Sequence, residues 1–476
     1  MSATELAAPR PLADGPAATP TPAPAATSDL AERRAMILNG ATVPTLLKLG
    51  LPTLLVLVVQ SLVNMLEAWY VGFLGTDALA GVALVFPVFM LMQTISNGGF
   101  GGGVAAAVAR ASGSGRRADA DALVFHSLAI AVTLGALFMV AGVLGGPLLY
   151  RAMGGTGAAL AAALTYSIWI FAASIPLWTV ALLASTLRGA GNVKVPALVT
   201  IGGFVVLVPL SPALIFGFGP FPRMGVAGGG IAIAAYFTAA ALVLIGYLTR
   251  PGATVRLRWV PMEWRHFKAI LGVGTVSSLN SIQFNITIAL VTAAVGSSTA
   301  AAIAGFGIAT RLDYLLIPLL FGFGSAAITM VATHLGAGDP QRAKRIAWTA
   351  AAMAFTVTEC IGLAAALFAP EWAGLFSHDP AVVATATDYL RRVAPFYGFF
   401  GVGLTLYFSA QGANRVGWLI LPGFARMVLA GGLGWYAVVA LGMNLTTLFW
   451  ITAAAYFTFG GSASLVTYVL RWGVKR

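Results

Sequence analysis

Three polar side chains lie along one face of an otherwise apolar stretch, residues 46–72. Gln60, Asn64 and Glu67 stand at positions i, i+4 and i+7, which brings them to the same side of an α-helix. A polar stripe faces lipid only at a high cost in free energy, so we expect it to line a cleft inside the protein. A carboxyl group in such a cleft can take up and release a proton, or hold a cation when it is ionised. Alternatively, Glu67 lies at an interface near the external end of its helix and is neutralised by a partner.

Asp313 and Glu359 are the other acids that lie well inside apolar stretches. Arg311 is two residues from Asp313, so the two side chains point to well-separated sides of a helix and are poor partners. We expect Asp313 either to pair with Arg426 from a later helix or to line a cleft in the second half of the chain. Glu359 is expected to have a structural role or to extend its carboxylate toward the membrane surface.

Several aromatic and polar residues could line a substrate cleft in the same helices. Aromatic faces attract organic cations, although helix packing or a place at the membrane interface is the favoured explanation for any single one of these residues. The candidates for the cleft are Tyr70, Tyr166, Trp169, Trp178, Ser281, Asn285, Tyr397 and Tyr407. Pro52 should kink its helix and could serve as a hinge for the segment that carries Glu67.

Residues that build catalytic or metal centres are scarce. The four histidines share no ligand spacing and Cys360 is the single cysteine, so the sequence indicates neither a metal site nor a disulfide. There is no Walker motif, and the glycine-rich stretch 97–103 follows no strand, so we do not expect ATP as the energy source. We therefore expect no enzymatic activity and no cofactor beyond a coupling ion.

The composition is that of a helical membrane protein. Hydrophobic residues make up 59% of the 476 residues and charged residues only 9%, whereas soluble proteins have about 25% charged residues. Uncharged runs are long enough for helices of about 20 residues that cross a bilayer. The predicted crossings are 46–72, 77–109, 119–148, 160–187, 195–217, 226–249, 266–295, 299–333, 342–369, 386–411, 417–440 and 445–470.

The basic residues fix the expected orientation of these helices. If both termini are cytoplasmic, most of the 27 lysines and arginines fall on the cytoplasmic side. This placement accounts for the net charge of +12 through contact with anionic lipid, so we expect no nucleic-acid partner. We expect a multi-pass protein of a bacterial inner membrane, acting as a monomer.

The chain contains an internal repeat. Residues 100–120 match 323–343, and 187–193 match 410–416 at the same offset, with glycines of the two halves in register. Each half has an even number of predicted helices, so the repeat is parallel and two six-helix bundles should face each other across a central cleft. The predicted division is a disordered cytoplasmic tail at 1–44, bundles at 45–249 and 266–471, a cytoplasmic linker at 250–265 and a short tail at 472–476.

These landmarks resemble the multidrug and toxic compound extrusion (MATE) family. The resemblance is carried by "LGLP…VGFLGTDALAG", by "ASGSGRRADA" with its repeat partner "HLGAGDPQRAK", by "LRGAGNVKVP" and by "LIFGFG…MGVAGGGIA". It implies an outward-open V of two bundles and export of cationic or amphipathic compounds against inward flow of H⁺ or Na⁺. The family usually has an aspartate at the position of Glu67. Many members also have an amide and an acid in helix five, where this chain has Leu207 and Ser211.

The sequence thus favours a secondary antiporter for small drug-like compounds, with Glu67, Asn64 and Gln60 at its coupling site. Since the second acid of the first bundle is absent, fewer oxygen ligands are available for Na⁺, and we expect H⁺ as the coupling ion. A flippase for a lipid-linked or polyprenyl substrate is the alternative within the same superfamily. It would be expected to have a basic cleft, for which only Arg311 and Arg426 are internal candidates.

Overall fold

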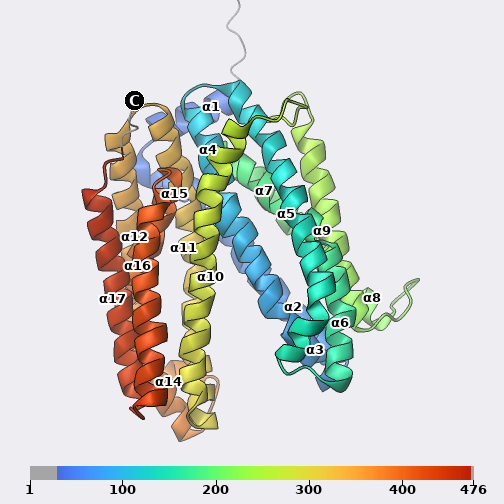
Figure 1. The fold of residues 1–476 in the computed structure, drawn as a ribbon, viewed down its shortest axis with the longest axis vertical. Coiled ribbons are helices and arrows are strands. Elements are labelled where there is room, and N and C mark those ends of the chain that lie inside the picture. Colours follow the sequence, from blue (N-terminus) through green and yellow to red (C-terminus); the bar gives the residue numbers. More distant parts are fainter. Residues whose placement is uncertain (1–28, 473–476) are drawn as a thin grey trace, which may run out of the picture.

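A computed structural model describes residues 29–472, in which the regular structure is helical. Figure 1 shows two groups of long helices that meet at the end where α1 lies and diverge toward the opposite end. The first half of the chain contains α1 (Asp29–Asn39), α2 (Thr42–Gly72), α3 (Thr76–Thr94), α4 (Gly101–Gly113), α5 (Arg117–Ala152), α6 (Gly157–Ala172), α7 (Ser174–Gly189), α8 (Lys194–Phe216) and α9 (Val226–Leu248). The second half contains α10 (Trp264–Gly296), α11 (Ala300–Gly336), α12 (Pro340–Leu367), α13 (Ala369–Gly374), α14 (Pro380–Val393), α15 (Tyr397–Gly412), α16 (Val416–Arg426) and α17 (Leu445–Val469).

The predicted count of twelve membrane crossings is confirmed. Within residues 29–472, eleven helices are long and apolar enough to span a bilayer, and the bent pair α6 and α7 makes the twelfth. The two helices of this pair meet at 47°. Pro176 lies three residues into α7. A proline there has no backbone N–H to donate, and its ring would clash with the preceding turn, so the helix breaks just before it.

Three of the crossings contain a wide π-helical turn or a short irregular segment. The π-helix η1 (Ile95–Phe100) joins α3 to α4, and the 3₁₀ turn η2 (Ala394–Phe396) joins α14 to α15. Two further π-helices, η3 (Met427–Leu433) and η4 (Tyr436–Ala440), continue α16. By contrast, α2 remains one continuous helix although it contains Pro52.

The two halves touch where α4 crosses α11. A Cβ atom on Gly113 would lie 2.1 Å from the backbone oxygen of Thr333, and one on Gly336 would lie 2.2 Å from that of Arg110. Both distances are far below van der Waals contact, so only glycine allows this approach. Gly113 is the repeat partner of Gly336, and Arg110 is that of Thr333. The two close contacts are therefore copies of each other, related by the internal repeat.

Another pair of repeat-related glycines makes equivalent close contacts, one within each half. A Cβ on Gly189 of α7 would lie 2.4 Å from the backbone oxygen of Ala105 in α4. The corresponding atom on Gly412 of α15 would lie 2.7 Å from that of Ile328 in α11. Two of the glycine pairs that reveal the repeat in the sequence are thus positions at which helix backbones make contact.

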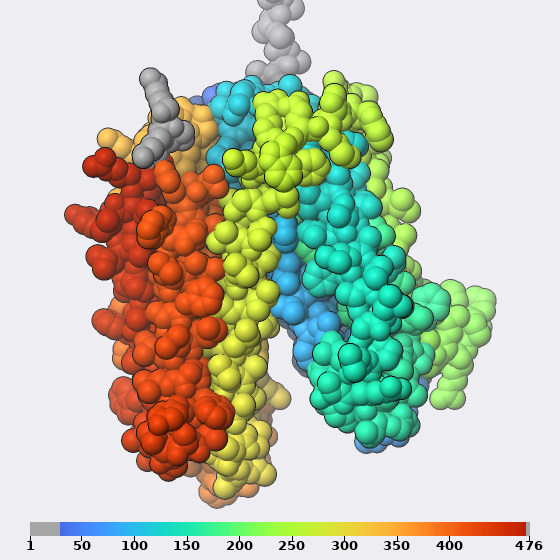
Figure 2. Space-filling view, in the orientation of Figure 1, coloured from blue at the N-terminus to red at the C-terminus, as the bar shows by residue number. Residues whose placement is uncertain are grey.

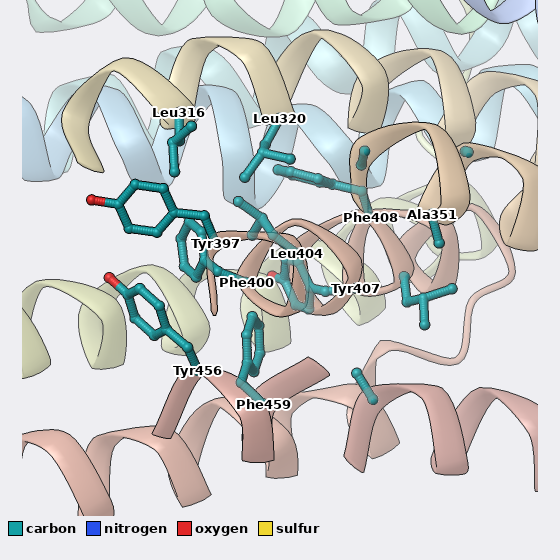
Figure 3. Close-up of a cluster of buried hydrophobic side chains, with 14 of the residues drawn as sticks. Leu316, Leu320, Ala351, Tyr397, Phe400, Leu404, Tyr407, Phe408, Tyr456 and Phe459 are labelled. Atoms are coloured by element: carbon teal, nitrogen blue, oxygen red, sulfur yellow. The ribbon is translucent and has the colours of Figure 1, made fainter. Parts of the chain in front are cut away.

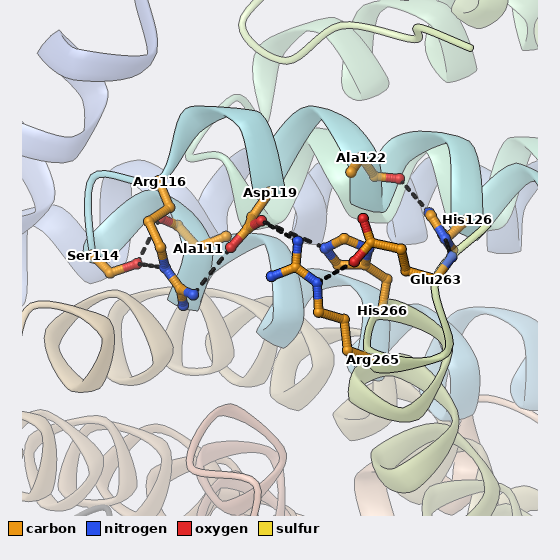
Figure 4. A network of polar contacts seen from close by, with 9 residues as sticks. All are labelled: Ala111, Ser114, Arg116, Asp119, Ala122, His126, Glu263, Arg265 and His266. Atoms are coloured by element: carbon orange, nitrogen blue, oxygen red, sulfur yellow. Dashed lines mark hydrogen bonds and ion pairs between the residues drawn. The ribbon is translucent and has the colours of Figure 1, made fainter. Parts of the chain in front are cut away.

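The space-filling view shows a V-shaped cleft between the two halves (Figure 2). The helix α10 forms one visible wall, α2 is seen at the back, and the cleft opens at the end away from α1. At the closed end a polar network joins α5 to the start of α10 (Figure 4). There Asp119 pairs with Arg116 at 3.0 Å and with Arg265 at 3.3 Å. The backbone N–H of Glu263 donates to His126 Nε2 at 2.9 Å.

Part of the expected disordered tail is in fact helical, so the prediction for residues 1–44 is wrong from residue 29 onward. Helix α1 buries Leu30 and Ile37, which lie seven residues apart and so share one face. It is held by Arg33 Nη1, which donates to the Gly191 carbonyl at 3.3 Å, and by Arg34 Nε, which donates to the Gly113 carbonyl at 3.0 Å. The remainder of that tail, residues 1–28, and residues 473–476 lie outside the described residues.

Candidate functional site

Glu67 lies inside the N-terminal bundle, near the last turn of α2. The residue is only 8% exposed. Ser211 Oγ, from α8, donates a hydrogen bond to Glu67 Oε2 at 2.7 Å. The other carboxylate oxygen, Oε1, is buried and has no hydrogen-bond partner among residues 29–472. Two helices that are distant in sequence therefore position one carboxyl group, of which only one oxygen is satisfied.

The surroundings of Glu67 offer little compensation for a buried negative charge. No lysine, arginine or histidine of the described chain forms an ion pair with it. Tyr166 of α6 and Gly229 of α9 lie close by, since a Cβ on Gly229 would be 3.7 Å from Tyr166 Cε2 and 3.8 Å from Glu67 Oε2. An ionised group removed from water needs a partner charge or several hydrogen bonds. Glu67 has neither, since Ser211 is its single hydrogen-bond donor in the described chain.

The other two members of the polar stripe contact different neighbours. Gln60 Nε2 donates to Gln93 Oε1, on α3, at 2.7 Å. Asn64 is partly exposed on the helix between the two. The Tyr70 hydroxyl donates to the Val208 carbonyl of α8 at 3.2 Å, one turn before Ser211. The stripe predicted on α2 is therefore shared between α3 and α8, and Glu67 is its only carboxylate.

The predicted aromatic residues of the N-terminal bundle have different environments. Tyr166 is buried beside Glu67, and Trp169 is 41% exposed. Trp178 is fully buried and packs against Phe100 and Phe138, with ring centroids 5.6 and 5.5 Å away. In this structure Trp178 belongs to the core of the bundle and does not line the cleft. This outcome agrees with the packing alternative for that residue.

Asp313 of α11 is held by tyrosines and not by an arginine. The Tyr389 hydroxyl donates to Asp313 Oδ2 at 2.5 Å and the Tyr397 hydroxyl donates to Oδ1. Tyr456 is close enough to interact with the same carboxylate, and Figure 3 shows the hydroxyls of Tyr397 and Tyr456 pointing to the same side of the cluster. The expected pair with Arg426 is absent among residues 29–472, where tyrosine hydroxyls are the donors to both carboxylate oxygens.

Arg426 lies at the end of α16, enclosed by aromatic rings and only 4% exposed. Its guanidinium carbon is 4.6 Å from the ring centre of Phe284, 5.5 Å from that of Phe459 and 5.7 Å from that of Phe400. Its Nε atom is buried without a partner in the described chain. A desolvated cation–π contact contributes about 2 kcal/mol, whereas burying an ion costs several kcal/mol. The rings lower that cost without neutralising the charge.

Ser281 and Asn285 make local contacts within α10. Ser281 Oγ donates to the Ser277 carbonyl at 3.3 Å, and Asn285 Nδ2 donates to the Ser281 carbonyl at 2.8 Å. The buried Tyr407 hydroxyl, from α15, donates to the same Ser277 carbonyl at 3.3 Å. These polar residues lie where α10 contacts α15, and they are separate from the tyrosines around Asp313.

Some contact residues were not singled out from the sequence. Gln93 and Tyr456 lie in apolar stretches and Tyr389 lies between Asp388 and Arg391, and no sequence pattern marks any of the three. Ser211 carried a signal, because it stands at the position where many relatives have an acid. The structure places this serine against the one carboxylate of the bundle.

The MatE family model matches residues 52–213 and 277–430, one segment in each half of the chain. A FAD transporter from Shewanella oneidensis is 26% identical over 81% of this chain and 85% of its own length. A probable multidrug resistance protein NorM from Thermotoga maritima is 26% identical over 78% and 80% of the two chains.

The fold has also been seen before. A solved structure described as the outward-facing conformation of a multidrug resistance MATE family transporter superposes with a TM-score of 0.83. It is 23% identical in sequence and covers 91% of this chain and 97% of its own. With the family model matching both bundles and the fold shared almost throughout, the chain belongs to the MatE family of multi-pass membrane transporters.

Proposed function

We propose that the protein exports cationic or amphipathic compounds in exchange for H⁺, and that Glu67 carries the coupled proton. The observation that carries this proposal is the state of the Glu67 carboxyl group. It is buried, it has a single hydroxyl donor and one unpartnered oxygen, and no basic residue of the described chain pairs with it.

The geometry suggests how a proton and a substrate could share this position. Ser211 holds Oε2, so the carboxyl group keeps its orientation while Oε1 stays available to a proton or to a substrate cation. Occupation by one would exclude the other, which is the competition that an antiporter requires. Tyr166 lies beside Glu67 and offers an aromatic surface to an organic cation.

The choice of H⁺ over Na⁺ is supported by the small number of oxygen ligands. A hard cation is normally held by several carboxylate, carbonyl or hydroxyl oxygens. Around Glu67 the contacts are one serine hydroxyl, an aromatic ring and a glycine. A proton needs only the carboxylate itself.

Inverted membrane vesicles test both parts of the proposal. Uptake of ethidium, a fluorescent cation, is driven by a pH gradient in vesicles with the native protein or with Glu67→Gln. We expect Glu67→Gln to abolish gradient-driven uptake and Glu359→Gln to leave it unchanged. Glu359 is a matched control, because it too is a carboxylate within a membrane helix and accepts one hydrogen bond, from the Gly398 N–H at 2.8 Å.

Normal uptake by Glu67→Gln with an unchanged pH dependence would contradict the assignment. Replacing the pH gradient with a Na⁺ gradient decides the coupling ion, because only a Na⁺-coupled protein would then accumulate ethidium. The relatives are named for multidrug resistance and for FAD, so a panel of compounds is needed to define the substrate.

A flippase for a lipid-linked substrate is the alternative. Such a protein needs basic side chains where the head group passes. Arg311 is exposed and stacks on Phe376 at 4.6 Å, and Arg426 is enclosed. Translocation of a fluorescent polyprenyl phosphate in proteoliposomes, without ethidium export, would favour this alternative.

A further inference from the structure

Arg426 is a buried cation for which the described chain provides no counter-ion. Its Nε atom is buried without a hydrogen-bond partner within residues 29–472, no residue there forms an ion pair with it, and the rings of Phe284, Phe400 and Phe459 lie around its guanidinium group. Arginine side chains at such sites are normally paired with a carboxylate or a phosphate, often by two parallel hydrogen bonds. An arginine without such a partner, more than nine-tenths buried, indicates that an anion comes from outside the chain.

Asp313, the partner that its charge suggests, is already engaged. Asp313 receives hydrogen bonds from Tyr389 and Tyr397 on its two carboxylate oxygens. Tyr456 lies within interaction range of both Asp313 and Arg426. The tyrosines thus satisfy Asp313, and within the described residues Asp313 and Arg426 form no ion pair.

The backbone beside Arg426 is irregular. The π-helix η3 begins at the next residue, Met427, and Pro422 lies one turn earlier in α16. Gln283 Nε2 from α10 donates to the Gly423 carbonyl at 2.7 Å, close to the turn that carries the arginine. Wide turns of this kind occur frequently at functional sites, where they set the direction of one side chain.

We propose that Arg426 binds the acidic group, a carboxylate or a phosphate, of an amphipathic substrate within the C-terminal bundle, and that the three phenylalanines contact its apolar part. The identification of this ligand as a transported substrate rests on the proposed function. It does not depend on Glu67 or on the coupling ion. It extends the expected substrates from cations to compounds that carry a negative charge.

The purified protein in detergent provides a direct test that requires no ion gradient. Binding of fluorescein, an aromatic carboxylate, is measured by fluorescence anisotropy, and ethidium serves as an aromatic cation of similar size. We expect Arg426→Gln to weaken fluorescein binding by at least about tenfold and to change ethidium binding by less than about twofold. Arg426→Lys keeps the charge but not the fork of donors, so it should retain part of the affinity.

Arg311→Gln is the matched control. Arg311 also lies on a membrane helix of this bundle and over a phenylalanine ring, but it is exposed. We expect it to bind both probes as the native protein does. Two competitors identify the source of the acidic group: displacement of fluorescein by benzoate indicates a soluble carboxylate, and displacement by phosphatidylglycerol indicates a lipid head group.

Three results would overturn the inference. They are an absence of fluorescein binding by the native protein, an equal loss of both probes in a folded Arg426→Gln, and a loss of fluorescein binding in Arg311→Gln as large as in Arg426→Gln. Monodisperse elution on size exclusion shows that each variant is folded. Because binding is measured without transport, a failure here is distinct from a failure of the Glu67 experiment.

Discussion

Replacing Gly113 by alanine should loosen the contact between the two bundles. The added methyl group would lie 2.1 Å from the Thr333 backbone oxygen. Since carbon and oxygen normally stay more than 3 Å apart, α4 and α11 must separate by roughly 1 Å. Overpacking of this kind costs about 1–3 kcal/mol, and the helix preference of alanine returns at most about 1 kcal/mol. Even with the full return from helix preference, we expect a net loss of stability of up to about 2 kcal/mol.

The assay is thermal unfolding of the purified protein in detergent, with Gly272→Ala as the control. Gly272 is a helical glycine of α10 with nothing within 4 Å of its added Cβ, so this variant should be as stable as the native protein or slightly more stable. Gly336→Ala should lower the melting temperature as Gly113→Ala does, because its methyl meets the Arg110 oxygen at 2.2 Å. The double variant should lose less than the sum, since one separation of the helices accommodates both methyls. Native-like melting of Gly113→Ala would refute the close crossing of α4 and α11.

Two further predictions concern the tyrosine-held carboxylate and the first helix. Asp313→Asn and Tyr397→Phe should each destabilise the protein, and a double-mutant cycle should give a coupling of about 1.5–3 kcal/mol, the range for a hydrogen bond to a charged group; additive effects would show that the two side chains do not interact. Burial opposes ionisation of Asp29, but the hydrogen bonds and the charge of Arg33 prevail and hold the pKa of Asp29 below its ordinary value. The ionised form is therefore favoured in the folded state, so docking of α1 should be strongest above the ordinary carboxyl pKa and weaken as the pH falls through the lowered one. The protection of α1 amides against hydrogen exchange should fall as the pH is lowered, and Arg33→Ala should make this fall smaller.

Much of the fold could be predicted because it depends on repeated, local signals. Long uncharged runs predict crossings, and the predicted range 77–109 compares with Thr76–Gly113 in the structure. The repeated Gly113 and Gly336 indicated two related halves, and their role in the structure explains why glycine is required at both positions. Helix α1 was missed because it buries only two apolar side chains and owes its position to arginine contacts with distant backbone carbonyls.

The candidate site could be predicted only in part. The spacing on α2 predicts Gln60 and Glu67 on one face, but it could not say which helix each would meet. Gln93 and Ser211 are their partners through contacts that depend on tertiary packing. Arg426 was a reasonable partner for Asp313 by charge alone. In the structure two tyrosine hydroxyls donate to Asp313 instead, and these contacts depend on the packing of α14 and α15 against α11.

The two halves share their glycine contacts but differ in their charges, and the difference suggests a division of roles. Both oxygens of Asp313 accept hydrogen bonds from tyrosines, whereas Glu67 has one oxygen without a partner in the described chain. Glu67 therefore has an oxygen that can accept a proton or a cation without competing with a donor from the described chain, whereas each oxygen of Asp313 already has one donor. In the C-terminal bundle, the buried Arg426 has an Nε atom without a partner in the described chain, so it can bind an anion without giving up that atom's contact to another residue. If both assignments hold, loss of Glu67 should impair transport of every substrate, and loss of Arg426 only that of acidic ones.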